Sequence, residues 1–343
     1  MIEIISKKGI AVDQRNMRQV ILDMPKYINQ GWNLAGSFSV NDAVNKIFFV
    51  GMGGSAIAGE ILKMYLTNDC EEFQKQQIPI EIVRDYSLPA TVDEHSLVFI
   101  VSYSGNTEET IAAFREALKK KAVCICLATG GKIQEIAKTV NTPCILLPKG
   151  MQPRASLALQ FFVLLRIMQN SNYIKNQKEN LEESVRVVSN PEKIEQAAQQ
   201  LVQSAKGKII LLYSSSRLFG LAYRWKCQIN ENAKQHSFVG VLSELNHNEL
   251  VAFMTKMSPI HVIFLKDEND HPQIKKRVAI CKELIIKRGY STTEIAVGGK
   301  TELSKIFSGI LLGDLFSYYL AIENNVDPTP IEIIDELKKR LVN

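Results

Sequence analysis

Short apolar runs alternate with longer helical segments along most of this chain, and this alternation limits its fold more than any other feature. The first clear run is Ile47–Val50, and similar runs rich in Val, Ile and Phe recur in both halves. Strands of this composition with helices between them form parallel sheets that helices cover on both faces. The sequence therefore predicts an α/β fold built from doubly wound parallel sheets.

Strands and helices can be assigned along the chain from this alternation. It predicts strands over residues 46–50, 79–83, 97–102, 122–128, 144–147, 208–213, 261–265 and 291–297. It predicts helices over residues 13–36, 55–66, 107–120, 133–138, 156–168, 221–234, 273–287 and 303–322.

The alternation occurs twice, which predicts two domains. A chain of 343 residues is long enough for two domains of ~150 residues each. Both halves place a strand, a turn of small residues and a helix near their start, at Val50-Gly51 and at Tyr213-Ser214. We expect an N-terminal domain with its leading helices over residues 1–152, a helical connection over 153–195 and a C-terminal domain over 196–343.

Composition and charge argue against several classes of protein. The net charge of +5 comes from Lys and Arg mixed with Asp and Glu, so no basic stripe for nucleic acid is formed. Cys124 and Cys126 have no second pair at ligand spacing, so we expect no metal site. No apolar run approaches the ~20 residues that span a bilayer, and the N-terminus shows no signal pattern. We expect a cytoplasmic protein that binds neither nucleic acid nor membrane.

A glycine-rich turn, GMGGSA, follows the first strand directly. Its spacing Gly51-x-Gly53-x-x-Ala56 satisfies the dinucleotide-binding fingerprint, in which glycines let the backbone approach a pyrophosphate. That fingerprint also needs an acidic residue about 20 residues further on to hold the ribose. The nearest candidate, Asp85, lies roughly 30 residues on, which speaks against a dinucleotide.

A second turn, VSYSGNTEET, ends the third strand and favours a different ligand. It offers Ser102, Ser104 and Thr107 beside a helix N-terminus. Together with Ser55 of the first turn, these hydroxyls would meet at the C-terminal edge of a parallel sheet, where ligands bind. A compact phosphate monoester needs several such donors on one group.

Each of these residues also has a purely structural explanation. Asn106 with Glu109 would make a capping box for the helix near Thr107, and Ser55 would cap the helix of the first turn. Taken singly, each hydroxyl fits a cap at least as well as a ligand. Taken together, they favour a phosphate.

The two turns resemble the phosphate loops of sugar isomerase (SIS) domains, and further segments extend the resemblance over nearly the whole chain. PRASL (153–157), NENAK (230–234), LNHNE (245–249), DPTP (327–330) and IDELKKRL (334–341) are similar to segments of the bifunctional phosphoglucose/phosphomannose isomerases. The resemblance implies two SIS domains, with Gly53, Gly54, Ser55, Ser102, Ser104 and Thr107 as substrate-binding residues.

The same resemblance implies the activity and its chemistry. Members of this family interconvert glucose 6-phosphate and mannose 6-phosphate with fructose 6-phosphate, in glycolysis and gluconeogenesis, and use no cofactor. A histidine suits opening of the sugar ring near neutral pH, and a glutamate suits proton transfer between C1 and C2 through a cis-enediol. A fixed cation or hydrogen bonds can stabilise the enediolate without a metal.

Individual roles are carried over from the matching segments. Glu231 in NENAK is assigned the C1–C2 proton transfer, although a helical glutamate is otherwise an ordinary surface charge. His247 in LNHNE is assigned ring opening, with Asn246 and Asn248 beside it to fix the tautomer of the ring. Arg154 in PRASL is placed near the reacting carbons, where its charge would stabilise an enediolate.

The C-terminal segment supplies two more candidates. Thr329 resembles a threonine near the substrate. Lys338 resembles an active-site lysine, although Lys339 is its neighbour and the match does not choose firmly between them; both also suit an ordinary basic helix end.

The resemblance further implies a homodimer with active sites near the subunit interface and sugar 6-phosphates as partners. The rival hypothesis is a non-catalytic SIS regulator that binds a sugar phosphate without turnover. Regulators of that kind usually carry a basic DNA-binding helix-turn-helix, and the sequence shows no such segment.

Overall fold

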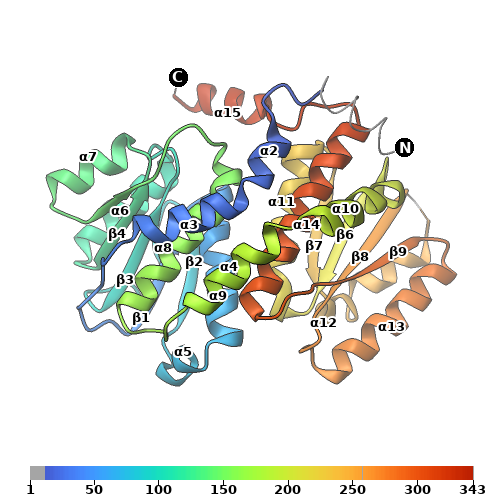
Figure 1. Cartoon of the computed structure of the whole chain (residues 1–343), viewed down its shortest axis with the longest axis horizontal. Coiled ribbons are helices and arrows are strands. Elements are labelled where there is room, and N and C mark those ends of the chain that lie inside the picture. The colour runs from blue at the N-terminus through green and yellow to red at the C-terminus, as the bar shows by residue number, and fades with distance from the viewer. Residues whose placement is uncertain (1–11, 257, 343) are drawn as a thin grey trace. The chain divides into compact units, whose positions relative to one another are not determined.

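A computed structural model describes residues 12–256 and 258–342 of the chain, in two compact units (Figure 1). The N-terminal unit consists of residues 23–189 and 299–305. Of the described residues, the C-terminal unit contains 12–22, 190–256, 258–298 and 306–342. Each unit contains one parallel sheet with helices packed on it, which confirms the predicted α/β fold class.

The sheet of the N-terminal unit has parallel strands in the order β2-β1-β3-β4-β5. This is the flavodoxin-like order, whose switch point lies between β1 and β3. The strands are β1 (Lys46–Val50), β2 (Ile80–Val83), β3 (Ser96–Val101), β4 (Val123–Ala128) and β5 (Cys144–Leu146). The helices are α3 (Met24–Leu34), α4 (Gly53–Asp69), α5 (Glu71–Gln76), α6 (Glu108–Lys119), α7 (Gly131–Thr139), η1 (Pro153–Ser156), α8 (Leu157–Asn170) and α9 (Lys178–Val188).

Neighbouring residues of β1 show how helices cover both faces of this sheet. Phe48 joins an apolar cluster with Phe114 of α6 and Ile133 of α7. Phe49 points the other way, where α4 comes so near that a Cβ on Gly59 would stand 2.6 Å from the Phe49 Cβ. Because β1 is apolar on both sides, it can lie in the middle of a sheet that is buried on both faces.

The sheet of the C-terminal unit repeats this arrangement with the order β7-β6-β8-β9. Its strands are β6 (Ile209–Ser214), β7 (Ser237–Val241), β8 (Ile260–Lys266) and β9 (Ser291–Ala296). Its helices are α2 (Met17–Leu22), α10 (Glu192–Ala205), η2 (Ser216–Leu218), α11 (Phe219–Ala233), α12 (Leu242–Leu245), η3 (Glu249–Met254), α13 (Pro272–Lys287) and α15 (Glu332–Val342). The helix α14 (Glu302–Glu323) belongs to this unit from Ile306 onward.

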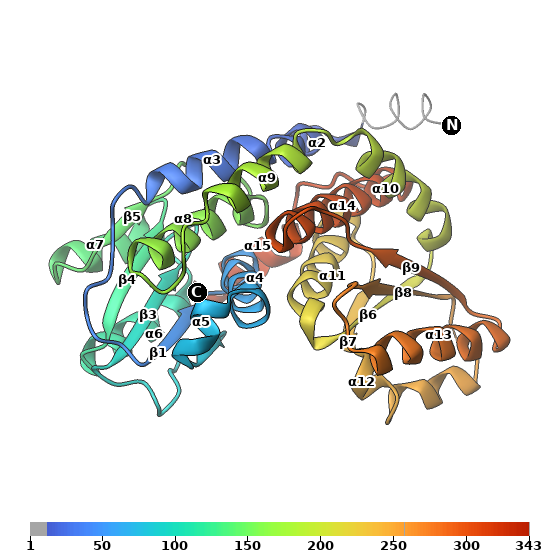
Figure 2. The same ribbon diagram turned by 60° about the horizontal axis from the view of Figure 1, so that its bottom comes forward.

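Buried polar contacts join α11 to α14 within the C-terminal unit. Arg224 of α11 makes a two-pronged ion pair with Asp314 of α14, at 2.8 and 3.0 Å. The indole N–H of Trp225 donates to the carbonyl of Gly309 at 2.8 Å. Figure 2 shows α11 and α14 on one side of this sheet and α12 and α13 on the other. The orientation of α11, which carries Glu231, is therefore fixed by buried polar bonds.

The predicted domain boundaries do not match the two compact units, since residues 299–305 also belong to the N-terminal unit. Residues 153–189 do not form a connection, because α8 and α9 belong to the N-terminal unit, and α8 packs on α3 and α4. Most side chains of α8 are buried, from Leu157 to Met168, so this helix is part of a core. The predicted helix over 13–36 is broken at Asp23, where Pro25 opens α3, and α2 belongs to the C-terminal unit.

The strand β7 and the helices α5, α9, α10 and α12 were not predicted. The strand β7 lies at the edge of its sheet, carries Phe238 exposed to solvent and contains Gly240, so it lacks an unbroken apolar pattern. The helix α9 lies in the polar stretch after Asn170 and presents only a narrow buried stripe. Weak apolar patterning explains these omissions.

The expectation that no apolar run reaches membrane-spanning length is also wrong. Among the described residues, α14 is long and apolar enough to cross a membrane, judged by length and composition alone. However, 89% of its most apolar stretch is buried inside the protein. A helix of this kind is typical of a protein core.

Candidate active site

The glycine-rich turn connects β1 to α4 at the C-terminal edge of the first sheet. The helix α4 begins at Gly53, and its N-cap Met52 provides no side-chain cap. Gly54 faces the segment 153–154, where an added Cβ would stand 2.8 Å from both the Arg154 Cα and the Pro153 carbonyl oxygen. Only glycine allows the arginine segment to come this close to the turn.

The second turn lies beside the first because β3 is the direct neighbour of β1. The backbone N–H of Tyr103 donates to the Ser55 hydroxyl at 3.2 Å, and the hydroxyls of Ser102 and Thr107 are 2.9 Å apart. Ser104 is exposed, and its hydroxyl accepts from the Asn106 N–H. The structure thus brings the predicted hydroxyl residues of both turns together at one edge of the sheet.

The capping-box explanation for these residues does not hold. The helix α6 begins at Glu108 with Thr107 as its N-cap, and no side chain caps it. The Asn106 side chain instead accepts a hydrogen bond from the Lys132 N–H at 2.9 Å. Ser55 lies inside the first turn of α4 and is not its N-cap. Two helix N-termini therefore present backbone N–H groups without side-chain caps, which is what anion binding needs.

Arg154 lies in the short helix η1 next to the glycine turn. Its side chain is buried, with 2% of the residue exposed. The Ser156 hydroxyl donates to the Pro153 carbonyl at 2.7 Å and accepts from the Gln160 amide, which ties η1 to α8. The structure thus combines a buried cation, two helix N-termini and several hydroxyls in the N-terminal unit.

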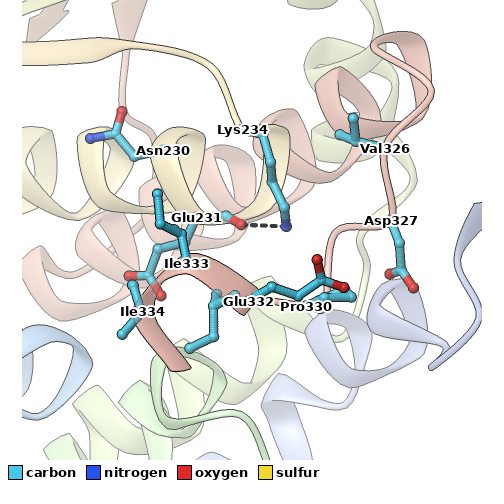
Figure 3. A pocket seen from close by; sticks show the side chains of 10 residues that line it. Asn230, Glu231, Lys234, Val326, Asp327, Pro330, Glu332, Ile333 and Ile334 are labelled. Carbon is cyan, nitrogen blue, oxygen red and sulfur yellow. Dashed lines mark hydrogen bonds between the residues drawn. The ribbon is translucent and has the colours of Figure 1, made fainter. Parts of the chain in front are cut away.

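A pocket of about 530 Å³ lies in the C-terminal unit around Glu231 (Figure 3). Glu231 and Lys234 come from the end of α11, Asp327 and Pro330 from the segment before α15, and Glu332 from α15 itself. Figure 3 shows the Glu231 carboxylate directed away from the Lys234 ammonium group, on the side of the pocket where Ile334 lies. The pocket is large enough for a sugar phosphate.

Lys234 closes the end of α11 and fixes the segment that follows α14. It takes a left-handed conformation with φ of 51°, which ends the helix. Its ammonium group donates to the carbonyls of Glu231 at 2.8 Å and of Pro328 at 3.2 Å. Thr329 is buried next to this contact, with 3% exposed, and its N–H donates to Asp327. The same lysine therefore bonds the backbone of Glu231 and that of Pro328, the residue before Thr329.

The other two predicted residues of this unit are exposed. His247 follows α12 and is not among the residues that line the pocket with Glu231. Lys338 and Lys339 both lie on exposed positions of α15, beyond the residues that line the pocket. Both lysines are therefore equally placed for the predicted role.

The asparagines beside His247 are engaged elsewhere. The Asn246 amide donates to the Cys281 sulfur at 2.9 Å and accepts from the Arg277 guanidinium at 2.7 Å. The Asn248 amide donates to Glu244 at 2.7 Å. The two side chains hold the loop in place, and they do not hold the tautomer of the His247 ring as the sequence suggested.

Sequence reasoning missed Lys234, Asp327 and Tyr103. Lys234 and Asp327 lie within the segments NENAK and DPTP, which were noted for other residues. Tyr103 stands between two serines of the second turn, where attention went to the hydroxyls that could hold phosphate. Over the described residues, no three His, Cys, Asp or Glu side chains are grouped so that they could hold a metal ion.

The two units have parallel sheets whose first four strands follow the same order, and in the first unit two helix N-termini at the sheet edge have no side-chain cap. These features are those of the sugar isomerase (SIS) class of proteins. The model of the SIS domain matches residues 42–160, and that of the bacterial phospho-glucose isomerase C-terminal SIS domain matches residues 194–341. A bifunctional phosphoglucose/phosphomannose isomerase from Caldicellulosiruptor bescii is 36% identical over 95% of this chain and 98% of its own length. This chain belongs to the family of bifunctional phosphoglucose/phosphomannose isomerases.

Two further similarities mark the breadth of the class. A D-glucosamine-6-phosphate 4-epimerase from Sulfolobus acidocaldarius is 29% identical over 87% of this chain and 90% of its own length. The C-terminal domain of glucosamine-fructose-6-phosphate aminotransferase from Francisella tularensis superimposes with a TM-score of 0.69 at 18% identity, covering 92% of this chain and 98% of that one. The second similarity concerns the fold alone.

Proposed function

We propose that this chain is an aldose–ketose isomerase that interconverts glucose 6-phosphate and mannose 6-phosphate with fructose 6-phosphate. The observation that carries the proposal is its 36% identity, along nearly its whole length, to a phosphoglucose/phosphomannose isomerase. The uncapped N-termini of α4 and α6, with Ser55, Ser102 and Thr107 beside them, support a phosphate monoester as the bound group. We place the reaction in cytoplasmic carbohydrate metabolism, at the step that glycolysis and gluconeogenesis share.

In this proposal a carboxylate transfers the proton between the reacting carbons, and cations stabilise the negative charge that develops. Glu231 takes the proton from C2 of the open-chain aldose and returns it to C1, while the C1 oxygen gains a proton and the C2 hydroxyl loses one, so that the ketose forms through a cis-enediol. Arg154 stabilises the negative charge of the enediolate, and Lys338 or Lys339 supplies a further cation. Thr329, whose N–H donates to Asp327, donates a hydrogen bond to the sugar from its hydroxyl. No cofactor takes part in these steps.

We further propose a homodimer in which His247 opens the sugar ring in the active site of the partner subunit. The support is that His247 is exposed and does not line the pocket around Glu231. Mixing separately inactive Glu231→Gln and His247→Ala subunits should restore activity, because one of the two sites in each mixed dimer is intact. No recovery in dimers shown to be mixed would refute a shared site.

A second candidate is epimerisation at C4 of glucosamine 6-phosphate, which the 29% identical relative from Sulfolobus acidocaldarius favours. A third is sugar-phosphate binding without turnover. Purified protein incubated with fructose 6-phosphate, followed by separation of the aldose phosphates, distinguishes them. Formation of both glucose 6-phosphate and mannose 6-phosphate is expected. Glucose 6-phosphate alone would refute the proposed mannose 6-phosphate activity, and absence of both products would refute the isomerase proposal. A parallel incubation with glucosamine 6-phosphate tests the epimerase.

A further inference from the structure

Tyr103 is buried in the second turn and forms hydrogen bonds to three separate segments of the N-terminal unit. Its N–H donates to the Ser55 hydroxyl of the glycine turn at 3.2 Å, and its carbonyl accepts from the Thr129 N–H at 2.9 Å. Its phenol donates to the Pro148 carbonyl at 2.8 Å and accepts from the Met151 N–H at 2.9 Å. Only 6% of the residue is exposed.

The phenol oxygen lies within a bend of four residues. Pro148 and Met151 are the first and last residues of this bend, and the carbonyl and N–H that a closed turn would join directly are both bonded to the phenol. Gly150 supports the bend with φ of 101°, a conformation that other residues rarely adopt. Burial raises the pKa of Tyr103, so the phenol keeps its proton and remains a donor at neutral pH.

The bend leads directly into η1 and Arg154. Ala155 donates its N–H to the Gln152 carbonyl at 2.8 Å, so the short helix starts one residue after the bend. On its other side, η1 is in contact with Gly54. The main chain around Arg154 is therefore held between two contacts. One is with Gly54 of the glycine-rich turn, and the other is with the phenol of Tyr103, a residue of the second turn.

We infer that Tyr103 is a positioning residue, which sets Arg154 relative to the phosphate-binding turns by holding the 148–151 bend open. This inference rests on the proposed isomerase function for its kinetic consequence. The phenol of Tyr103 contacts the bend, whereas its backbone contacts the turns. Substitution of the side chain therefore removes the contacts with the bend and keeps those with the turns. The phosphate-binding turns keep their backbone contacts when the phenol is lost.

The test is Tyr103→Phe, which removes one oxygen and keeps the ring. The bend can then close by a direct bond between Pro148 and Met151, so the chain should still fold. We expect kcat for fructose 6-phosphate to fall about 10- to 100-fold while KM changes less than about twofold, since a small displacement of a catalytic group is costly. We also expect amide hydrogen exchange over residues 151–156 to accelerate by about tenfold.

Tyr65→Phe is the matched control in the same unit. Tyr65 is also buried, and its phenol likewise donates once, to Gln177 at 2.7 Å, and accepts from Asn180 at 3.1 Å. It should lose comparable stability without changing kcat or the exchange of residues 151–156. An equal loss of kcat in Tyr65→Phe would show that reduced stability, rather than position, explains the effect.

A double-mutant cycle tests whether Tyr103 acts through Arg154. Arg154→Lys keeps the charge but loses the planar fork. If the inference is right, Tyr103→Phe lowers kcat much less in the Arg154→Lys background than in the wild type. Full multiplication of the two losses, or unchanged exchange over 151–156 in Tyr103→Phe, would overturn it. If the wild type does not isomerise sugar phosphates, the proposed function fails, and the exchange measurement still decides whether Tyr103 holds the arginine segment.

Discussion

The first strand and helix of each sheet occupy the same place in the topology but are joined by chemically different turns. In the N-terminal unit the turn after β1 is glycine-rich, and hydroxyl groups face it from the turn after β3. In the C-terminal unit the turn after β6 contains Arg217, which forms an ion pair with Asp267 at 2.9 Å. Asp267 directly follows β8, the counterpart of β3, and accepts from the Asn269 N–H. Where the first unit can receive a phosphate, the second unit places its own buried carboxylate.

The corresponding helices also differ in which end carries the functional groups. The helix α4 has its glycines and Ser55 at the N-terminus, where backbone N–H groups favour an anion. The helix α11 carries Glu231 in its last turn, beside Lys234. The shared topology therefore fixes where strands end and turns meet, and a few side chains distinguish the unit that we propose to bind phosphate from the unit that we propose to supply the base. Four predictions test this division.

Loss of the proposed base, Glu231, should have the largest effect on turnover. Glu231→Gln removes the carboxylate of the second unit and leaves the turns of the first unit intact, so kcat should fall about 10²- to 10⁴-fold. Binding of inorganic phosphate, measured by calorimetry, should not change. Glu283→Gln, on an exposed position of α13 in the same unit, is the control. Retention of near-normal turnover by Glu231→Gln in a pure preparation would show that the base is another residue.

Gly54→Ala should damage the first unit's turn next most strongly. The added Cβ would stand 2.8 Å from the Arg154 Cα and the Pro153 carbonyl oxygen, and main-chain atoms cannot move aside as a flexible side chain can. We expect kcat/KM to fall about 10- to 100-fold. Gly298→Ala is the control, because a Cβ there meets nothing within 4 Å. Similar kinetics for the two variants would mean that η1 yields to the methyl group.

Most of the fold could be predicted because its signals are local. Apolar runs such as Ile47–Val50 indicate interior strands directly. The glycines and hydroxyl residues of the turns after the first and third strands lie within a few residues of each other in the sequence, so the proposed phosphate site could be predicted from short motifs. The α8 helix shows the limit of this reasoning. Its apolar sequence predicted a helix correctly, but only the contacts with α3 and α4 place it in a core instead of a connection.

The site could be predicted less completely because its supporting bonds join distant residues. The partners of Tyr103, at Pro148 and Met151, lie 45 and 48 residues away. The partners of Asn246, at Arg277 and Cys281, lie 31 and 35 residues away. No spacing rule links such pairs, so the motifs identified candidate residues and left their orientation open.

Breaking the Arg217–Asp267 pair should affect stability and leave catalysis alone. Asp267 is 6% exposed, and Asp267→Asn leaves the guanidinium without its carboxylate, so we expect unfolding to become easier by about 2–4 kcal/mol. Urea unfolding of the Trp32→Phe background, in which the buried Trp225 reports on the C-terminal unit, measures this. The kcat of Asp267→Asn should match that of the wild type. A large loss of turnover would mean that this turn has a part in the reaction.

The smallest predicted effect is a loss of stability at acidic pH in the C-terminal unit, caused by the buried His261. His261 of β8 lies opposite Ile210 of β6, whereas the equivalent place in the first sheet pairs Leu97 with Ile47. The ring bonds the hydroxyls of Ser291 at 2.9 Å and Thr293 at 3.0 Å, and Lys208 donates to the same Ser291 at 3.0 Å. Burial, with the charge of Lys208 as a second cause, lowers the pKa of His261 to about 4.

Because the pKa of His261 is lower in the folded chain than in the unfolded chain, the folded state is most stable at pH values above the pKa of the unfolded chain. As the pH falls from about 6.5 towards 4, His261 binds a proton in the unfolded chain but not in the folded chain. The free energy of unfolding therefore falls by about 1–2 kcal/mol after solvent screening. His261→Gln keeps a hydrogen-bonding side chain that does not titrate, and it should flatten this dependence in the Trp225 signal. The exposed His95→Gln in the N-terminal unit should not. If the Trp32 signal of a Trp225→Phe background falls just as steeply over this range, His261 does not set the acid sensitivity of the second unit.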